Sequence, residues 1–255
     1  MTPDSLLVQE VAPSPNHDAR ADGAEPCILL LHYTGMRDGA AALARLRDPQ
    51  SKVSCHYLVE EDGRIIQLVP EARRAWHAGA GSWRGREDVN SRSIGIEIVN
   101  PGHEHGYRAF TPAQIAATIE LCRDCVARWP ITPDQVLAHS DTAPSRKRDP
   151  GELFPWDQLF SAGIGVWVEP APISGGRFLS TGDRGQPVEA YQALLATFGY
   201  GVVIDGIFDD RTRAATIAFQ RHFRPARVDG VADGSTIDTL YRLTILQSEG
   251  RSWTR

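Results

Sequence analysis

Two histidines and an aspartate stand where the chain leaves short apolar runs or enters a turn. His32 ends the apolar run 27–31, and His139 follows another short apolar run. Asp149 precedes Pro150, which favours an extended backbone and can hold the carboxylate outward. Two imidazoles and one carboxylate are the three ligands of a catalytic zinc that keeps a fourth position open. Because the three residues are far apart in the sequence, their spacing alone does not prove a metal site.

A glutamate stands inside another apolar run. Along residues 93–100, strand alternation puts three isoleucines on one face and Glu97 on the other, between Gly95 and Val99. An ionised carboxylate in such surroundings costs several kcal/mol unless it is paired, linked to a metal or used in chemistry. Glu97 is therefore either a structural residue satisfied by nearby donors or part of an active site.

The composition bounds the class of protein. The chain has 255 residues, is 42% hydrophobic and carries a formal net charge of -5. This length suits one large domain, or a medium domain and a small one, with a real core. The acidic balance argues against a nucleic-acid partner, because phosphate recognition normally requires a basic surplus. The basic run 146–148 is too short to change that expectation.

Cysteine usage and the N-terminal sequence bear on the compartment. The four cysteines show no dense disulfide spacing, and Cys122 and Cys125 fall three apart in a predicted helix, which favours packed thiols over a redox pair. No signal peptide is visible, and no run approaches membrane-spanning length. The sequence therefore predicts a cytoplasmic protein with no transmembrane segment and leaves the oligomeric state open.

Strand and helix patterns alternate along the first two thirds of the chain. The turn at 61–64 contains Asp-Gly between two β-type runs, which is a strong hairpin signal. Residues 70–92 and 140–148 are predicted to be loops, the first of them at the rim of the protein. Strands are predicted at 26–32, 53–60, 65–69, 93–100 and 136–139, and helices at 40–47 and 111–128. The fold class is α/β, with a mixed central β-sheet flanked by helices.

The C-terminal third repeats itself. Residues 205–212 and 229–236 share the pattern Asp-Gly-aliphatic-x-Asp-x-x-Thr, and each copy leads into a helical pattern. Asp-Gly favours a turn, and the second Asp of each copy is a predicted helix cap. The loops are too short and have too few ligands for calcium. A small helical domain is therefore expected after a linker rich in Gly and Pro.

Five separated motifs carry a family resemblance. They are Leu31-His32-Tyr33-Thr34, Ser54-Cys55-His56-Tyr57, Ala75-Trp76-His77-Ala78-Gly79, Ser93-Ile94-Gly95-Ile96-Glu97, and Ala138-His139 through Lys147-Arg148-Asp149-Pro150. In this order they resemble the type 2 N-acetylmuramoyl-L-alanine amidases, bacterial zinc enzymes related to phage amidases and animal peptidoglycan recognition proteins. The resemblance covers about residues 25–165.

The resemblance implies roles for the residues that match. His32, His139 and Asp149 match the ligands of one Zn²⁺ per chain, Glu97 matches the general base, and Lys147 matches the residue that stabilises the oxyanion. Three further residues match the substrate groove: Trp76, His77 and Asn90. His56 also matches a family position and is either a groove residue or a packing residue behind it. The remaining histidines, His17, His103, His105 and His222, receive no role.

The C-terminal repeat resembles the three-helix peptidoglycan-binding domain that is often joined to cell-wall hydrolases. The predicted organisation is an N-terminal arm at 1–26, a catalytic domain at 27–162, a linker at 163–180, a helical domain at 181–247 and a tail at 248–255. The predicted function is hydrolysis of the amide between N-acetylmuramic acid, or its 1,6-anhydro form, and L-alanine. The alternative is a non-catalytic peptidoglycan-recognition protein. A wall-binding domain also makes the cell envelope an alternative location.

Overall fold

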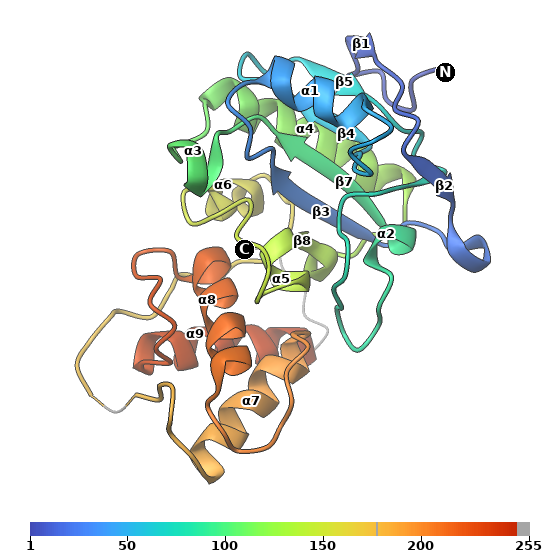
Figure 1. Cartoon of the computed structure of the whole chain (residues 1–255). Helices are drawn as coiled ribbons and strands as arrows, with labels where there is room; N and C mark the ends of the chain where they lie inside the picture. The colour runs from blue at the N-terminus through green and yellow to red at the C-terminus, as the bar shows by residue number, and fades with distance from the viewer. Residues whose placement is uncertain (177, 249–255) are drawn as a thin grey trace.

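The computed structural model describes residues 1–176 and 178–248, and it has two parts in contact (Figure 1). The larger part is a β-sheet with helices on its faces, and the smaller part consists of the helices α7, α8 and α9. This architecture confirms the predicted α/β class with a small helical domain. No helix within the described ranges is both long and apolar enough to cross a membrane.

The central sheet has six strands and is mixed. Their order across the sheet is β1 (Glu10–Val11), β5 (Ile65–Gln67), β4 (Tyr57–Val59), β7 (Ser93–Ile98), β3 (Ile28–Tyr33) and β8 (Val136–Ala138). The β4–β5 pair is antiparallel, as the Asp-Gly turn predicted, and the other pairs are parallel. A separate antiparallel pair joins β2 (His17–Ala19) to β6 (Arg73–Ala75).

The register of the central strands brings the chemical residues together. His32 on β3 lies opposite Glu97 on β7, and Leu31 lies opposite Ala138 on β8, so that His139 follows at the same sheet edge. Parallel strands end on the same side of a sheet, and ligands bind there in open α/β folds. Strand pairing thus places residues that are up to 107 positions apart within one site.

Helices cover both faces of the sheet. The longest of them, α4 (Pro112–Arg128), begins with a capping box in which Thr111 and Gln114 exchange hydrogen bonds, and it packs on the isoleucines of β7. On the opposite face, Leu46 of α1 packs against Leu58 and Ile66. The remaining helices of this part are α1 (Gly39–Arg47), α2 (Val89–Arg92), α3 (Gly102–His105), α5 (His139–Thr142) and α6 (Trp156–Ser161), with 3₁₀ turns η1 (Ala21–Gly23) and η2 (Pro133–Gln135).

The helical domain consists of α7 (Gln186–Phe198), α8 (Asp210–Phe223) and α9 (Gly234–Ser248). Gln192 binds the first Asp-Gly turn through backbone amides and carbonyls, and Gln220 binds the second in the same way. Asp209 accepts hydrogen bonds from the first turn of α8, and Asp233 does the same for α9. The predicted repeat and its helix caps are therefore confirmed.

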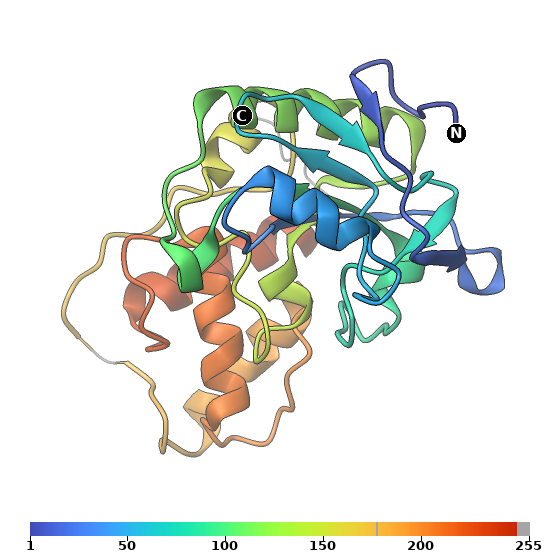
Figure 2. The ribbon, with the colours of Figure 1, turned by 45° about the horizontal axis from the view of Figure 1, so that its top comes forward.

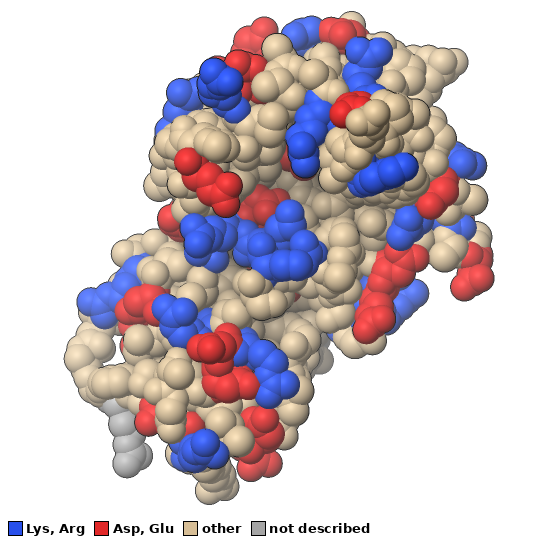
Figure 3. Space-filling model, viewed as in Figure 1, with Lys and Arg blue, Asp and Glu red and all other residues tan. Residues whose placement is uncertain are grey.

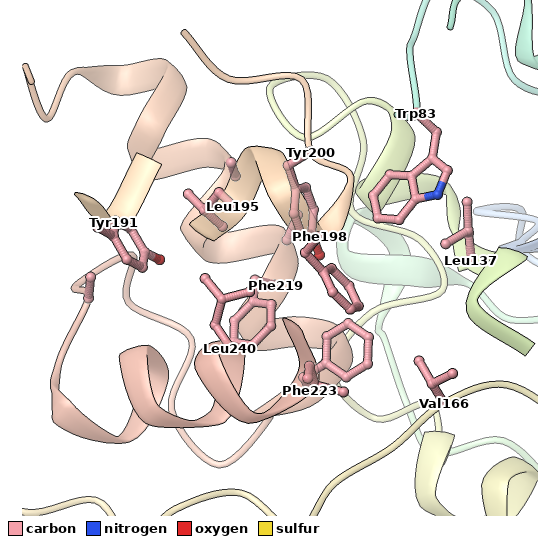
Figure 4. Packing of buried hydrophobic residues seen from close by; sticks show 14 of the residues in the cluster. Trp83, Leu137, Val166, Tyr191, Leu195, Phe198, Tyr200, Phe219, Phe223 and Leu240 are labelled. Atoms are coloured by element: carbon pink, nitrogen blue, oxygen red, sulfur yellow. The ribbon is translucent and has the colours of Figure 1, made fainter. Parts of the chain in front are cut away.

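One apolar core crosses from the sheet part into the helical domain (Figure 4). Trp83 and Leu137 lie on one side, and Phe198, Tyr200 and Phe223 lie on the other. The rings of Trp83 and Tyr200 meet edge to face, with centroids 5.3 Å apart. Trp83 is only 1% exposed. The prediction that 70–92 is a rim loop was wrong for this residue, because the helical domain covers it.

Other segments are more ordered than the sequence suggested. The N-terminal arm supplies β1 to the central sheet and β2 to the small one. Within the predicted linker, Ile164 and Val166 are buried, and Leu179 pairs with Ala232 of the helical domain. His139 begins the short helix α5 and does not end a strand, so the segment 140–148 is not all loop. The tail from residue 249 lies outside the described residues.

Candidate active site

Three side chains form a tight cluster at the carboxyl edge of the sheet. His32 Nδ1, His139 Nδ1 and Asp149 Oδ2 lie 2.9 Å from one another in every pair. The three come from the end of β3, the start of α5 and the turn before Pro150. All three are buried, and they are the one group of potential metal ligands found in the described part of the chain. The structure thus brings together the three residues that the sequence suggested for zinc.

Hydrogen bonds behind the cluster set its proton positions. His139 Nε2 lies 2.9 Å from the carbonyl oxygen of Ala78, which can only accept, so Nε2 carries the proton and Nδ1 presents a lone pair. His32 Nε2 lies 3.0 Å from Nδ1 of His77. A ligating histidine almost always donates its outer N–H in this way, which orients the ring.

His77 continues this hydrogen-bond chain into the protein. Its Nε2 lies 3.3 Å from Ser93 Oγ, and that hydroxyl donates to the carbonyl of Val89 at 2.6 Å. The Ser93 oxygen therefore accepts from His77 Nε2–H, which leaves His77 Nδ1 free to accept from His32. The backbone N–H of His77 donates to Asn90 Oδ1 at 3.0 Å. His77 and Asn90 thus hold His32 from behind.

The electrostatics of the cluster suit a metal ion. Burial, together with the charge of His139, lowers the pKa of His32 to about 4, so this imidazole is neutral at pH 7. Burial alone would raise the pKa of Asp149, but the imidazoles of His139 and His32 hold it well below its usual value. Imidazole nitrogens that present a lone pair and an ionised carboxylate oxygen are the donors that zinc prefers. The residues present therefore fit a zinc ion.

Glu97 and Lys147 face the same cavity, which has a volume of about 860 Å³. Glu97 Oε2 is buried and has no hydrogen-bond partner among the described residues. Burial, reinforced by the charge of Asp149, raises the pKa of Glu97 well above its ordinary value, while Lys147 acts in the opposite direction. A carboxyl group without a structural partner, next to three potential metal ligands, is available to move protons.

The residues predicted for the substrate groove fall in different places. Trp76 and His77 line the cavity, and Asn90 lines a smaller adjoining pocket with them. His56 is fully buried and is absent from both linings. Its Nδ1 accepts from the backbone N–H of Gly95 at 2.9 Å, and its Nε2 donates to the carbonyl of Arg73 at 3.0 Å. Both ring nitrogens of His56 are therefore occupied by backbone.

A buried group that the sequence did not reveal supports the turn of His139. Asp141 Oδ2 accepts from the backbone N–H of Ala138 at 2.8 Å and lies 2.7 Å from His222 Nδ1 on α8. Tyr200 donates its hydroxyl to Asp141 Oδ1 at 2.7 Å. The helical domain thus holds the α5 turn beside the cluster of His32, His139 and Asp149. The sequence alone assigns no role to His222, since 81 residues separate it from Asp141 and no local pattern connects them.

His103 is a second residue that gained a place from the structure. It lines the cavity, and its Nε2 lies 3.1 Å from Glu152 Oε2. Its Nδ1 lies 3.0 Å from the hydroxyl of Tyr33, which follows the ligand His32. Arg221 of α8 also reaches Glu152, with 3.4 Å between Nε and Oε2. These contacts connect the cavity wall to the helical domain.

A sheet edge that gathers two imidazoles, an aspartate and an unpartnered glutamate in one open cavity defines a metal-dependent hydrolase. The family model described as N-acetylmuramoyl-L-alanine amidase matches residues 22–152. The chain belongs to this family, which is zinc-dependent in general. A second family model, described as putative peptidoglycan binding domain, matches residues 184–240.

Curated relatives agree with the family. The chain is 43% identical over 223 residues to N-acetylmuramoyl-L-alanine amidase AmiD of Escherichia coli, a match that covers 82% of this chain and 79% of AmiD. It is 35% identical over 161 residues to 1,6-anhydro-N-acetylmuramyl-L-alanine amidase AmpD of Escherichia coli, covering 56% of this chain and 86% of AmpD.

Solved structures agree as well. The chain matches the complex of E. coli AmiD with anhydro-N-acetylmuramic acid-L-Ala-D-gamma-Glu-L-Lys, with a TM-score of 0.74, 41% identity, and coverage of 90% of this chain and 93% of that one. It also matches AmpDh3 from Pseudomonas aeruginosa, with a TM-score of 0.72, 31% identity, and coverage of 90% and 94%. The predicted enzyme, an N-acetylmuramoyl-L-alanine amidase, is confirmed, and nothing in these comparisons supports the non-catalytic alternative.

Proposed function

We propose that this chain is a zinc amidase in which His32, His139 and Asp149 hold one Zn²⁺ and Glu97 moves the protons of the reaction. The observation that carries the proposal is the position of an unpartnered Glu97 carboxyl in the same cavity as three donor atoms 2.9 Å apart. A zinc ion bound there supplies a Lewis acid that polarises a carbonyl and makes water more acidic.

The residues of the chain perform the remaining steps. Glu97 takes a proton from the attacking water and returns it to the leaving amine of L-alanine, acting first as base and then as acid. The ammonium of Lys147, which lines the cavity, stabilises the negative charge that develops on the carbonyl oxygen. His77 and Asn90 keep the His32 ring in the orientation and tautomer that ligation needs.

We further propose that the substrate is a peptide-substituted muramic acid, in peptidoglycan or in soluble anhydro-muropeptides. The AmiD complex contains such a molecule, and the cavity of about 860 Å³ is large enough for a sugar and several residues. The helical domain would hold the polymer, which raises the local concentration of cleavable bonds. Preference for the polymer or for the soluble fragment separates the envelope location from the cytoplasmic one.

The test is mass spectrometry of the products released by zinc-loaded protein. Intact sacculi and anhydro-muropeptides are supplied in parallel, with a chelated sample and the Glu97→Gln variant as controls. We expect stem peptides with a free L-alanine amine, lost on chelation and in Glu97→Gln. Glu97→Gln should still bind zinc, since Glu97 is outside the ligand cluster. Binding to sacculi with no peptide released would reject the enzyme mechanism.

A further inference from the structure

We propose that helix α8 of the helical domain forms one wall of the substrate site and that Arg213 on it binds a carboxylate of the substrate's peptide. This inference rests on the proposed function, because it places the peptide next to the amide that is cut. The helical domain would then select substrates within the active site, in addition to holding the polymer.

The cavity that contains the three potential metal ligands is closed on one side by α8. Its lining includes His139, Glu97 and one face of α8, formed by residues 210, 213, 214, 217 and 221. Residues three and four apart share a face of a helix, so this set is a continuous stripe. Figure 2 shows α8 running beside the yellow-green segment that contains α5 and the residues after it. A substrate that reaches these potential metal ligands therefore lies near α8.

The charge of the cavity is opposite to that of the whole chain. The chain carries a formal net charge of -5, but the lining has six Lys and Arg side chains against four carboxylates. The carboxylates are Glu97, Glu104, Asp149 and Asp210, and the cations are Arg45, Arg146, Lys147, Arg148, Arg213 and Arg221. Figure 3 shows Lys and Arg gathered in the hollow between the two parts. Such a site favours an anionic ligand.

Of the two cations that α8 contributes, Arg213 is available to a ligand. Arg221 lies against Glu152, and Arg146 donates to the carbonyls of Ala78 and Ala80. Arg213 is exposed, and it forms no ion pair with any residue that the structure describes. Its guanidinium can therefore bind a carboxylate through two parallel hydrogen bonds without first breaking another pair.

The peptide in the ligand of the AmiD complex carries free carboxylates. In the ligand of the AmiD complex, Glu is joined through its γ-carboxyl, which leaves its α-carboxylate free, and the last residue carries a second free carboxylate. These free carboxylates are opposite in charge to Arg213, which lines the same cavity as His139, Asp149 and Glu97. The guanidinium of Arg213 is therefore a suitable partner for a carboxylate of the stem peptide.

The experiment compares two substrates and two variants of the full-length, zinc-loaded protein. The substrates are anhydro-N-acetylmuramic acid-L-Ala-D-γ-Glu-L-Lys and the same molecule with both peptide carboxylates converted to amides. The variants are Arg213→Ala and the matched control Arg211→Ala. Arg211 lies on the same helix, pairs with Asp205 and Asp209, and is absent from the cavity lining. Both changes remove one positive charge from an exposed position.

We expect Arg213→Ala to raise KM for the acidic substrate about threefold to tenfold, with kcat nearly unchanged, because a charge-assisted hydrogen bond is lost. KM for the amidated substrate should stay as in the wild type, and Arg211→Ala should change neither. The inference would be overturned, and the amidase activity left intact, if the ratio of KM for the amidated substrate to KM for the acidic substrate were the same in wild type and Arg213→Ala. Failure of the wild-type protein to cleave either substrate would overturn the proposed function, and this inference with it.

Discussion

Removing the hydroxyl of Tyr200 tests whether the helical domain holds the catalytic turn, which is the short helix α5 that begins with His139. This hydroxyl donates to Asp141 Oδ1 at 2.7 Å, and it is the one hydrogen-bond partner of that oxygen in the described structure. Tyr200 is 2% exposed and Asp141 is fully buried, so water does not replace the lost donor. A hydrogen bond to a charged group contributes about 1.5–3 kcal/mol. We therefore expect Tyr200→Phe to lower the free energy of unfolding by about 2 kcal/mol.

The chain offers a matched control. Tyr191 is equally buried and donates to Thr216 Oγ1 at 3.0 Å, inside the helical domain and away from the catalytic turn. Tyr191→Phe removes a bond between neutral groups, which costs about 1 kcal/mol. Both variants can be measured by denaturant unfolding of the full chain, with zinc affinity determined by competition with a chelating dye.

Zinc affinity separates a local role from general destabilisation. Asp141 supports the turn that begins with His139, so we expect Tyr200→Phe to weaken zinc binding severalfold and Tyr191→Phe to leave it unchanged. If the two variants lost the same stability and bound zinc equally well, the support of the catalytic turn by the helical domain would be refuted.

Three further predictions concern Gly95, Glu71 and the proposed zinc site. A Cβ at Gly95 would lie 2.5 Å from the His77 ring, so Gly95→Ala should displace that ring and weaken zinc binding about 10- to 100-fold, measured by metal competition. Burial raises the pKa of Glu71, but hydrogen bonds from Arg128, Trp129 and Tyr57 lower it below its usual value overall. The stability that this carboxylate contributes is present above its unfolded pKa of about 4.3 and is lost as the pH falls through the lower folded value. In urea unfolding, Glu71→Gln should therefore cost about 3 kcal/mol at pH 7 and progressively less as the pH falls through that folded value. Chelation of zinc should lower the melting temperature of the wild type but not of a variant that lacks a ligand, such as Asp149→Ala, and equal shifts in both would argue against the proposed zinc site.

Local patterns predicted much of the sheet part. The helix predicted at 111–128, the Asp-Gly turn at 61–64 and the apolar runs before His32 and His139 depend on patterns within a few residues, so the sequence alone predicts them. The family motifs also named the three candidate ligands and Glu97, because each motif is a short run that can be matched within the sequence itself.

Tertiary structure alone decided how these parts support one another. The sequence predicts a rim loop around Trp83, but in the folded chain the helical domain covers this residue. No sequence pattern connects His222 to Asp141. The tautomers of His32 and His139 depend on His77 and on the carbonyl of Ala78, which lie after β6, 45 and 61 residues away along the chain. Sequence spacing encodes contacts along one helix or strand, whereas these contacts arise from packing between distant elements, so only the folded chain determines them.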